Sequence, residues 1–323
     1  MCSAKMLAKR SVLLSMVLCA PWSKQVKGQA TTAEAQRLQA DGKVELARDA
    51  FEQALLRDPA DASAREGMSL SSERLALAQR DAGHMDDALA SLLRAQQAEP
   101  DDKRILLDLG ILEDEMSLYL DAASTLEHLQ SLPPVDPNVW YALARVNMSL
   151  GKLTEAGQEM RSYLAVQPQD ASAHYGLGSI YLQGLQFDKA ERELQQSIAI
   201  QPKQSEAYYQ LGEAYLDQDR YVESIAEFEK VLERDPQHGG ALAGVGIAYF
   251  KLKQYDKAKG WLLKSTLAAP DYQVGHYYLG LTLSRIGDAA GSQRELEIAT
   301  ALAAKDAKQL ASRLRLNNAE GQP

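Results

Sequence analysis

The sequence predicts an all-α protein whose fold is an α-solenoid of about eight helix-turn-helix repeats, each near 34 residues long. Three observations on the 323-residue chain support this prediction. Seven of its eleven prolines form a regular series, and from Pro100 onward successive members of that series are 34 residues apart. A small residue recurs with the same period. A second small position is followed, four residues later, by a large apolar side chain. A fixed period in this range indicates a stacked array.

Four positions of the repeat carry this periodicity. The prolines are Pro59, Pro100, Pro134, Pro168, Pro202, Pro236 and Pro270. The first small position holds Ala35, Ala76, Gly110, Ala144, Gly178, Gly212, Gly246 and Gly280. The second holds Ala47, Ala88, Ala122, Ala156, Ala190, Ser224, Ala258 and Ser292. The large apolar residue is Phe51, Leu92, Leu126, Met160, Leu194, Phe228, Leu262 and Leu296.

Each unit reads as a helical hairpin, because two apolar stretches of helical period are separated by a turn. Glycine marks that turn at Gly42, Gly83, Gly151 and Gly287. The small residues let two helix backbones approach closely, and the bulky residues fill the gaps between them. The proline lacks an N–H group and disfavours helix at the preceding residue, so it ends the second helix. A lone hairpin cannot bury both faces, whereas stacking eight of them creates a continuous core.

In chain order, the prediction is a leader over 1–30, an array over 31–306, and a capping helix with a polar tail over 307–323. The repeats are expected near 28–61, 62–102, 103–136, 137–170, 171–204, 205–238, 239–272 and 273–306.

Two repeats depart from the common pattern. Pro59 and Pro100 are 41 residues apart, seven more than the period. Since seven residues are two helical turns, we expect a longer first helix from about Asp61 to Ala82. The last repeat ends in Ala304 instead of proline, and residues 305–316 should continue as an amphipathic helix. Its apolar side is expected to cover the end of the stack through Leu310 and Leu314.

The leader differs in composition from the rest of the chain. Residues 1–30 hold five basic residues, no acidic residue and both cysteines, and residues 11–20 form an apolar stretch. Such a stretch behind a positive segment is typical of a secretory signal. We expect a periplasmic or secreted protein cleaved after Ala30, because Pro21 would follow the earlier candidate bond. The alternatives are a lipid anchor at Cys19, a retained anchor and an organelle transit peptide.

The charge of the remaining chain excludes several classes of function. The whole chain has a net charge of −9, and residues after the leader carry 30 basic against 44 acidic side chains. This balance argues against binding the phosphate backbone of nucleic acids. No apolar run reaches the ~18 residues that a membrane span needs. No thiol follows residue 30, which excludes disulfides and cysteine metal sites there.

This 34-residue pattern of prolines, small residues and large apolar residues resembles that of the tetratricopeptide repeat (TPR) family. Residues 205–238 show the family positions as Tyr208, Leu211, Gly212, Tyr215, Ser224, Phe228, Val231 and Pro236. Residues 137–170 show them as Trp140, Leu143, Ala144, Ala156, Met160 and Pro168. The resemblance covers roughly residues 28–306. It implies a right-handed superhelix in which the first helix of each unit lines the concave face and binds a partner.

The resemblance also places a row of tyrosines on that face. The fifth position of successive units holds Leu107, Tyr141, Tyr175, Tyr209, Ala243 and Tyr277. The predicted partner-binding groove consists of Tyr141, Tyr175, Tyr209, Tyr277, Arg145, Glu213, Phe250 and Lys251. Tyrosine offers a rigid ring with a polar tip, which suits recognition of a partner. The alternative is that these tyrosines only pack between adjacent first helices. Glu213 and Asp217 would repel a carboxylate, which argues against chaperone-tail binding.

Catalytic and metal-binding patterns are missing from the sequence. The histidines are His84, His128, His174, His238 and His276, and no pair has the i, i+4 spacing of a metal site. The glycine-rich stretch 239–246 opens a helix and lacks the strand and the Lys-Ser/Thr of a phosphate loop. We therefore expect no cofactor, no metal and no enzymatic activity.

The first functional hypothesis is an exported, non-catalytic scaffold that binds a protein or peptide partner in the tyrosine-lined groove. An apolar or mildly basic extended peptide, or a partner helix, fits that groove. The second hypothesis is a structural or assembly subunit of a cell-envelope machine, such as a pilus, a secretion system or a polysaccharide exporter. The third is an accessory module of an enzyme complex. Self-association is also possible for such an array.

Overall fold

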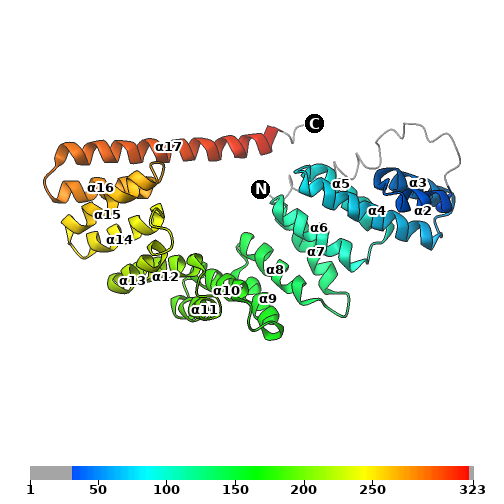
Figure 1. Ribbon diagram of the computed structural model, residues 1–323, viewed down its shortest axis with the longest axis horizontal. Helices are drawn as coiled ribbons and strands as arrows, with labels where there is room; N and C mark the ends of the chain where they lie inside the picture. Colours follow the sequence, from blue (N-terminus) through cyan, green and yellow to red (C-terminus); the bar gives the residue numbers. More distant parts are fainter. Residues whose placement is uncertain (1–30, 320–323) are drawn as a thin grey trace. The chain divides into compact units, whose positions relative to one another are not determined.

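The computed structural model describes the backbone of residues 31–319 and the side chains of residues 31–308. The predicted leader, with Cys19 and the cleavage site after Ala30, lies outside the described residues. Across 31–319 the chain forms sixteen α-helices and no strand, in eight successive pairs (Figure 1). The predicted all-α repeat fold is therefore confirmed. None of these helices is both long enough and apolar enough to cross a membrane.

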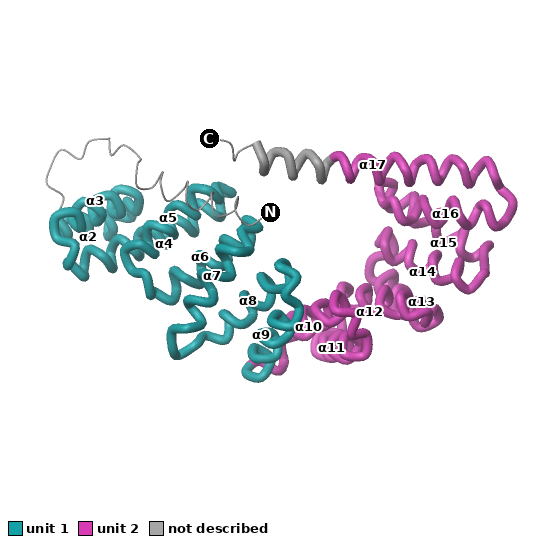
Figure 2. The backbone as a smooth tube through the Cα atoms, turned by 180° about the vertical axis from the view of Figure 1, so that it is seen from behind, with its two compact units in different colours: residues 1–166 teal, residues 167–323 magenta. Residues whose placement is uncertain are grey.

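The helices group into two compact units, one ending at Val166 and the other starting at Gln167 (Figure 2). Unit 1 contains α2 (Thr32–Ala40), α3 (Val44–Arg57), α4 (Ala62–Asp81), α5 (Met85–Ala98), α6 (Lys103–Glu115), α7 (Tyr119–Gln130), α8 (Pro137–Ser149) and α9 (Leu153–Val166). Unit 2 contains α10 (Ala171–Gln183), α11 (Phe187–Ile200), α12 (Ser205–Asp217), α13 (Tyr221–Leu232), α14 (Gly239–Lys251), α15 (Tyr255–Ala268), α16 (Gln273–Arg285) and α17 (Ala289–Ala319). The even-numbered helices are the first helices of the repeats, and the odd-numbered ones are the second helices.

Local chemistry explains where the helices begin and end. Several first helices start after an aspartate whose carboxylate accepts backbone N–H groups of the first turn, as Asp136 does from Asn138 at 2.8 Å. Within each hairpin the turn uses a left-handed residue. The four predicted glycines have φ between 73° and 87°, and Ser117, Leu185, Asp219 and Lys253 have φ between 55° and 61°. A tight helix-to-helix turn therefore forms even where glycine is missing.

The seven extra residues of the second repeat lengthen its first helix, as predicted. Helix α4 has 20 residues, from Ala62 to Asp81, whereas the other first helices from α6 to α16 have 13. It begins after the N-cap Asp61 and ends at the C-cap Ala82. Adding two whole turns preserves the buried face of the helix, so the insertion extends the helix rather than forming a loop.

The core of unit 2 repeats one contact between a bulky residue on a second helix and glycine on first helices. Phe228 on α13 is 1% exposed. A Cβ built on Gly212 of the same repeat would lie 2.8 Å from its ring, and one on Gly244 of the next repeat 2.3 Å. The ring therefore fills the space between two first helices that only glycine leaves open.

Most first helices of successive repeats contact one another inside each unit. Helix α2 contacts α4 and α6 contacts α8 in unit 1, and α10, α12, α14 and α16 contact one another in sequence in unit 2. Within these units, successive second helices make no comparable contact over the described residues. Since the first helices lie closer together, they line the inner face of each unit. This arrangement agrees with the inner face that the family resemblance implied.

Helix α17 is the largest departure from the repeat. It has 31 residues, about twice the length of the other second helices, and it runs without a break from Ala289 to Ala319. The predicted continuation of helix beyond Ala304 is present, but as part of α17 rather than as a separate element. A cap over the end of the same stack by Leu310 and Leu314 would require the chain to turn back after Ala304, and the unbroken α17 does not turn back. The predicted cap is therefore not formed by the described backbone of this chain.

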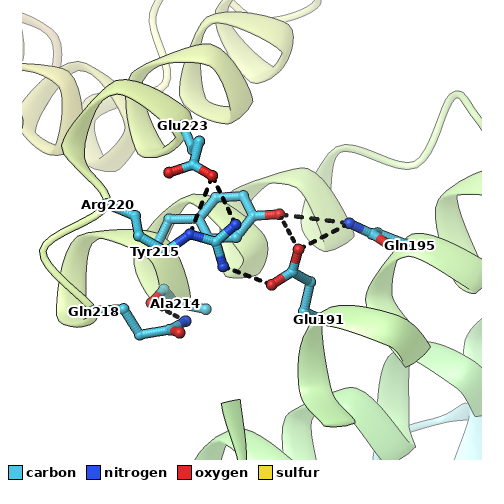
Figure 3. Close-up of polar contacts among 7 residues, drawn as sticks. All are labelled: Glu191, Gln195, Ala214, Tyr215, Gln218, Arg220 and Glu223. Atoms are coloured by element: carbon cyan, nitrogen blue, oxygen red, sulfur yellow. Dashed lines mark hydrogen bonds and ion pairs between the residues drawn. The ribbon is translucent and has the colours of Figure 1, made fainter. Parts of the chain in front are cut away.

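A polar cluster joins two repeats on α11, α12 and α13 (Figure 3). The guanidinium of Arg220 donates to the Glu191 carboxylate at 2.7 Å and to Glu223 at 2.7 Å. The hydroxyl of Tyr215 donates to Glu191 at 2.8 Å, and the Arg220 guanidinium lies 4.1 Å from the centre of the Tyr215 ring. Partial burial opposes ionisation of Glu191, but the hydrogen bonds from Arg220 and Tyr215 outweigh it and lower the pKa of this carboxyl.

This cluster predicts a specific acid sensitivity. A carboxyl whose pKa is lowered by folding stabilises the protein above its unfolded pKa, and this stabilisation is lost as the pH falls through the folded pKa. Between pH 7 and pH 3, the free energy of unfolding of the wild type should therefore fall by more than that of Glu191→Gln, measured by urea titration at each pH. Glu229→Gln, an exposed carboxyl on α13, is the matched control and should follow the wild type. Identical pH profiles for wild type and Glu191→Gln would contradict the assignment.

Candidate partner-binding surface on the first helices

The predicted groove residues lie on first helices of the two units. Unit 1 contributes Tyr141 and Arg145 from α8. Unit 2 contributes Tyr175 from α10, Tyr209 and Glu213 from α12, Phe250 and Lys251 from α14, and Tyr277 from α16. All eight lie on first helices, as the repeat phase predicts. Some of these residues contact neighbouring helices, and others are exposed to solvent and can contact a partner.

Tyr209 joins three successive first helices of unit 2. Its ring lies 5.6 Å from the Phe228 ring and 5.0 Å from the imidazole of His238. A Cβ on Gly240 would lie 2.8 Å from the Tyr209 hydroxyl, so glycine at this point of α14 makes room for the ring. The hydroxyl donates to the Glu213 carboxylate and shares a hydrogen bond with Tyr272, the N-cap residue of α16.

The ionisation behaviour of this group follows from its position. Burial strongly raises the pKa of Tyr209, and the negative charge of Glu213 raises it further. Desolvation also raises the pKa of Glu213, as does the nearby carboxylate of Asp217, while the hydrogen bond from Tyr209 has the opposite effect. Tyr209 is thus a neutral, half-buried residue that fixes helix positions, and Glu213 accepts a hydrogen bond from its hydroxyl.

Tyr175 joins α10 to α12. The side-chain amide of Gln210 donates to the Tyr175 hydroxyl at 3.0 Å, and the Ser179 hydroxyl donates to the carbonyl oxygen of the same amide at 2.8 Å. Burial raises the pKa of Tyr175, and the carboxylates of Glu206 and Glu213 add to the effect. Tyr175 and Tyr209 therefore pack between adjacent first helices, which was the alternative to direct contact with a partner.

An aromatic group on α14, α16 and the first residue of α15 is more open. Tyr277 is 43% exposed, and its ring meets Tyr278 edge-on with centres 5.4 Å apart. Tyr278 in turn packs against Phe250 at 5.7 Å, and Phe250 packs against Tyr255 at the same distance. We call Phe250, Tyr255, Tyr277 and Tyr278 the aromatic cluster. The exposed Lys251 follows Phe250 at the end of α14.

In unit 1 the two predicted residues already have intramolecular contacts. The Tyr141 ring packs edge-on against Tyr163, with centres 5.2 Å apart. The Arg145 guanidinium forms an ion pair with the largely buried Asp114 at 2.9 Å. Desolvation raises the pKa of Asp114, and the positive charge of Arg145 opposes that shift. Arg145 therefore compensates a carboxylate of α6, which reduces its availability to a partner.

The repeat phase alone missed three residues of this surface. Gln210 and Tyr278 each occupy the position after the tyrosine that was singled out, and Tyr272 precedes α16 altogether. The sequence did not indicate these three residues, because the family resemblance does not assign their positions to the partner surface. Their roles depend on which neighbouring helix their side chains reach.

Two of the histidines have a shared structural role in unit 2. In His174 and His276, one ring nitrogen lies 2.7 Å from a glutamate of the second helix, Glu193 or Glu295. The other ring nitrogen faces the carbonyl of the preceding proline, at 3.2 Å in His174 and 3.0 Å in His276. These contacts tie each first helix to its own second helix and to the preceding turn. Across the described residues, no group of three or more His, Cys, Asp or Glu side chains is arranged to hold a metal ion.

The fold and this surface define a helical repeat scaffold whose first helices present the inner face. Sequence comparison places the scaffold in a family. A tetratricopeptide repeat model matches residues 32–71, 107–171, 158–205 and 175–238, and a second model of the same description matches residues 215–281. Together they span more than half of the chain, and the protein belongs to the tetratricopeptide repeat family. No curated protein sequence matches the chain.

Solved structures share the architecture at low identity. The C-terminal part of a tetratricopeptide repeat protein from Cytophaga hutchinsonii is 18% identical, covers 71% of this chain and 94% of its own, and has a TM-score of 0.58. A tetratricopeptide repeat protein from Parabacteroides merdae is 18% identical, with 78% and 96% coverage and a TM-score of 0.52. PilF of Pseudomonas aeruginosa is 16% identical, with 60% and 88% coverage and a TM-score of 0.52. At these identities the similarity shows the fold alone.

Proposed function

We propose that the protein is a non-catalytic scaffold that binds a protein or peptide partner on the inner face of unit 2, with the aromatic cluster as the main anchor. The observation that carries this proposal is Tyr277, which is 43% exposed on a first helix next to two further aromatic rings. Exposed aromatic side chains held by rigid helices bury much area at a low cost in conformational entropy.

The rest of the inner face supports a division of roles. Tyr175 and Tyr209 hold α10, α12 and α14 in register, and their hydroxyls are engaged in hydrogen bonds. Glu206, Glu213 and Asp217 line α12 as exposed carboxylates, whereas Lys251 and Arg285 are exposed on α14 and α16. The surface therefore changes from acidic to aromatic and basic along unit 2. A partner segment with an apolar or aromatic side chain at its centre fits the aromatic cluster.

This function predicts a loss of affinity that is confined to the aromatic cluster. Peptides selected from a displayed random library against the full chain are the probes, and their affinities are measured by fluorescence anisotropy. Tyr277→Ala and Phe250→Ala should weaken binding by about tenfold or more, because truncating an interface anchor removes buried contact area. Tyr175→Ala and Tyr209→Ala should weaken it too, by loosening the helices beneath.

The matched control is Val222→Ala, which truncates an apolar side chain that is 70% exposed on the second helix α13. It should leave the affinity of the same peptides unchanged. Far-UV circular dichroism of each variant distinguishes a local loss of contact from unfolding. If Tyr277→Ala and Phe250→Ala bind the selected peptides as tightly as the wild type, the aromatic cluster is not the binding surface.

A further inference from the structure

An open groove lies along α17 at the end of the last repeat. It is mainly apolar and is lined by Ser284 of α16 and by one face of α17 from Ala289 to Ala304, which includes Leu296, Glu297 and Thr300. Inside unit 2, the next first helix covers the corresponding surface, as Gly244 of α14 does over Phe228. Phe228 and Leu262 are accordingly 1% and 0% exposed. Leu296 is the next residue of this series and is only partly buried, because no first helix follows α17 among the described residues.

The continuation of α17 does not cover this groove. Residues 305–319 extend the same helix past the end of α16 instead of turning back (Figure 1). Because the helix is unbroken, residues 305–319 cannot pack against residues 289–304 of the same helix. Over residues 31–319, the groove therefore has no occupant from its own chain, and the extension has no first helix beside it.

The groove and the extension match each other in length and in charge. At 1.5 Å per residue, the groove over 289–304 is ~24 Å long and the extension over 305–319 is ~22 Å long. The groove half of α17 is weakly acidic: it contains Glu295, which is paired with His276, and Glu297 against Arg294, and Asp288 directly precedes the helix. Glu297 is the carboxylate that lines the groove. By sequence the extension is basic and contains leucine, with Lys305, Lys308, Leu310, Arg313, Leu314 and Arg315 against the single acid Asp306.

We propose that the groove of one molecule receives the α17 extension of a second copy of this chain, in an antiparallel dimer with two-fold symmetry. In this arrangement each extension takes the place of a ninth first helix in the other molecule. The two contacts are identical because the same two segments meet twice around the two-fold axis. Antiparallel pairing also sets the basic half of each α17 against the acidic half of the other.

Oligomeric state tests the proposal directly. The full chain should have twice the mass of one chain by light scattering after size exclusion, and a chain that stops after Ala304 should be a monomer. Thr300→Arg places a positive charge in the groove against the basic extension, and it should shift the full chain to monomer. Leu267→Arg, at a residue of α15 that is 80% exposed and outside the groove, should stay dimeric. A monomeric wild type, or a dimer that survives both the truncation and Thr300→Arg, would overturn the proposal.

Cross-linking tests the antiparallel orientation. With Cys2→Ser and Cys19→Ser the chain has no thiol, so one introduced cysteine reports on its own symmetry mate. Residue 304 lies at the midpoint of α17, whereas the two copies of residue 289 would be ~45 Å apart. Ala304→Cys should therefore form a disulfide-linked dimer under mild oxidation, and Ala289→Cys should not. Cross-linking at both positions indicates a parallel pair, and cross-linking at neither indicates another occupant; either result rejects this dimer.

Discussion

Phe228→Ala should lower the free energy of unfolding of unit 2 by about 3–5 kcal/mol, the range for truncating a large aromatic core residue. The ring is 1% exposed and lies between Gly212 of its own repeat and Gly244 of the next. Its removal leaves a cavity that two rigid helices cannot close. Since each repeat is stabilised by its neighbours, the interfaces on both sides of α13 should weaken together.

Trp261 provides the measurement, because it packs against the same core cluster as Phe228. Its fluorescence is followed through urea unfolding in a background with Trp22→Phe and Trp140→Phe. Leu267→Ala serves as the control, since that side chain is 80% exposed and its loss should change the free energy of unfolding by less than about 0.5 kcal/mol. A cost below about 1 kcal/mol for Phe228→Ala would show that the ring does not carry the packing between the repeats.

Gly244→Ala should destabilise unit 2 by about 1–3 kcal/mol, although alanine is the better helix former. The added methyl group would lie 2.3 Å, 2.5 Å and 2.8 Å from three carbon atoms of the Phe228 ring. The ring is enclosed and cannot move away, so the helix α14 must shift. Urea unfolding followed by Trp261 fluorescence measures the change.

The same substitution at Gly260 of α15 should have the opposite sign. A Cβ there would meet no atom within 4 Å. Gly260→Ala should therefore stabilise the protein by about 0.5–1 kcal/mol through helix propensity alone. In a Phe228→Ala background, Gly244→Ala should lose most of its cost, because the ring that it meets is gone. An unchanged cost in that background would mean that the strain at Gly244 has another source.

The hairpins themselves could be predicted from local patterns. The period of 34 residues, the glycine turns and the closing prolines specify helix positions within a single unit, so eight hairpins and the longer α4 agree with expectation. Those features depend on residues within a few turns of one another, and helical period and turn chemistry are readable at that range. The position of the first helices on the inner face was implied by the family resemblance and not by the spacing itself.

The roles of the individual tyrosines could not be predicted in this way. Tyr175, Tyr209 and Tyr277 occupy one position of the repeat, yet the first two hydrogen-bond to neighbouring repeats and the third is 43% exposed. The difference arises from residues about a repeat or more away. Gln210 reaches Tyr175, and both Gly240 and Tyr272 accommodate Tyr209. A periodic pattern contains no information on which side chain a neighbouring helix brings to that position.

By itself, then, the sequence determined the class of fold and the number of hairpins. These follow from local spacing, because a helix exposes the same face every 34 residues when the units are alike. Only the tertiary structure decided which aromatic residues are left available, how the chain divides into two compact units, and that α17 continues past its groove. These features depend on packing between helices. A glycine beneath an aromatic ring, or the absence of a following helix, changes which side chains are exposed without changing the 34-residue period of the sequence.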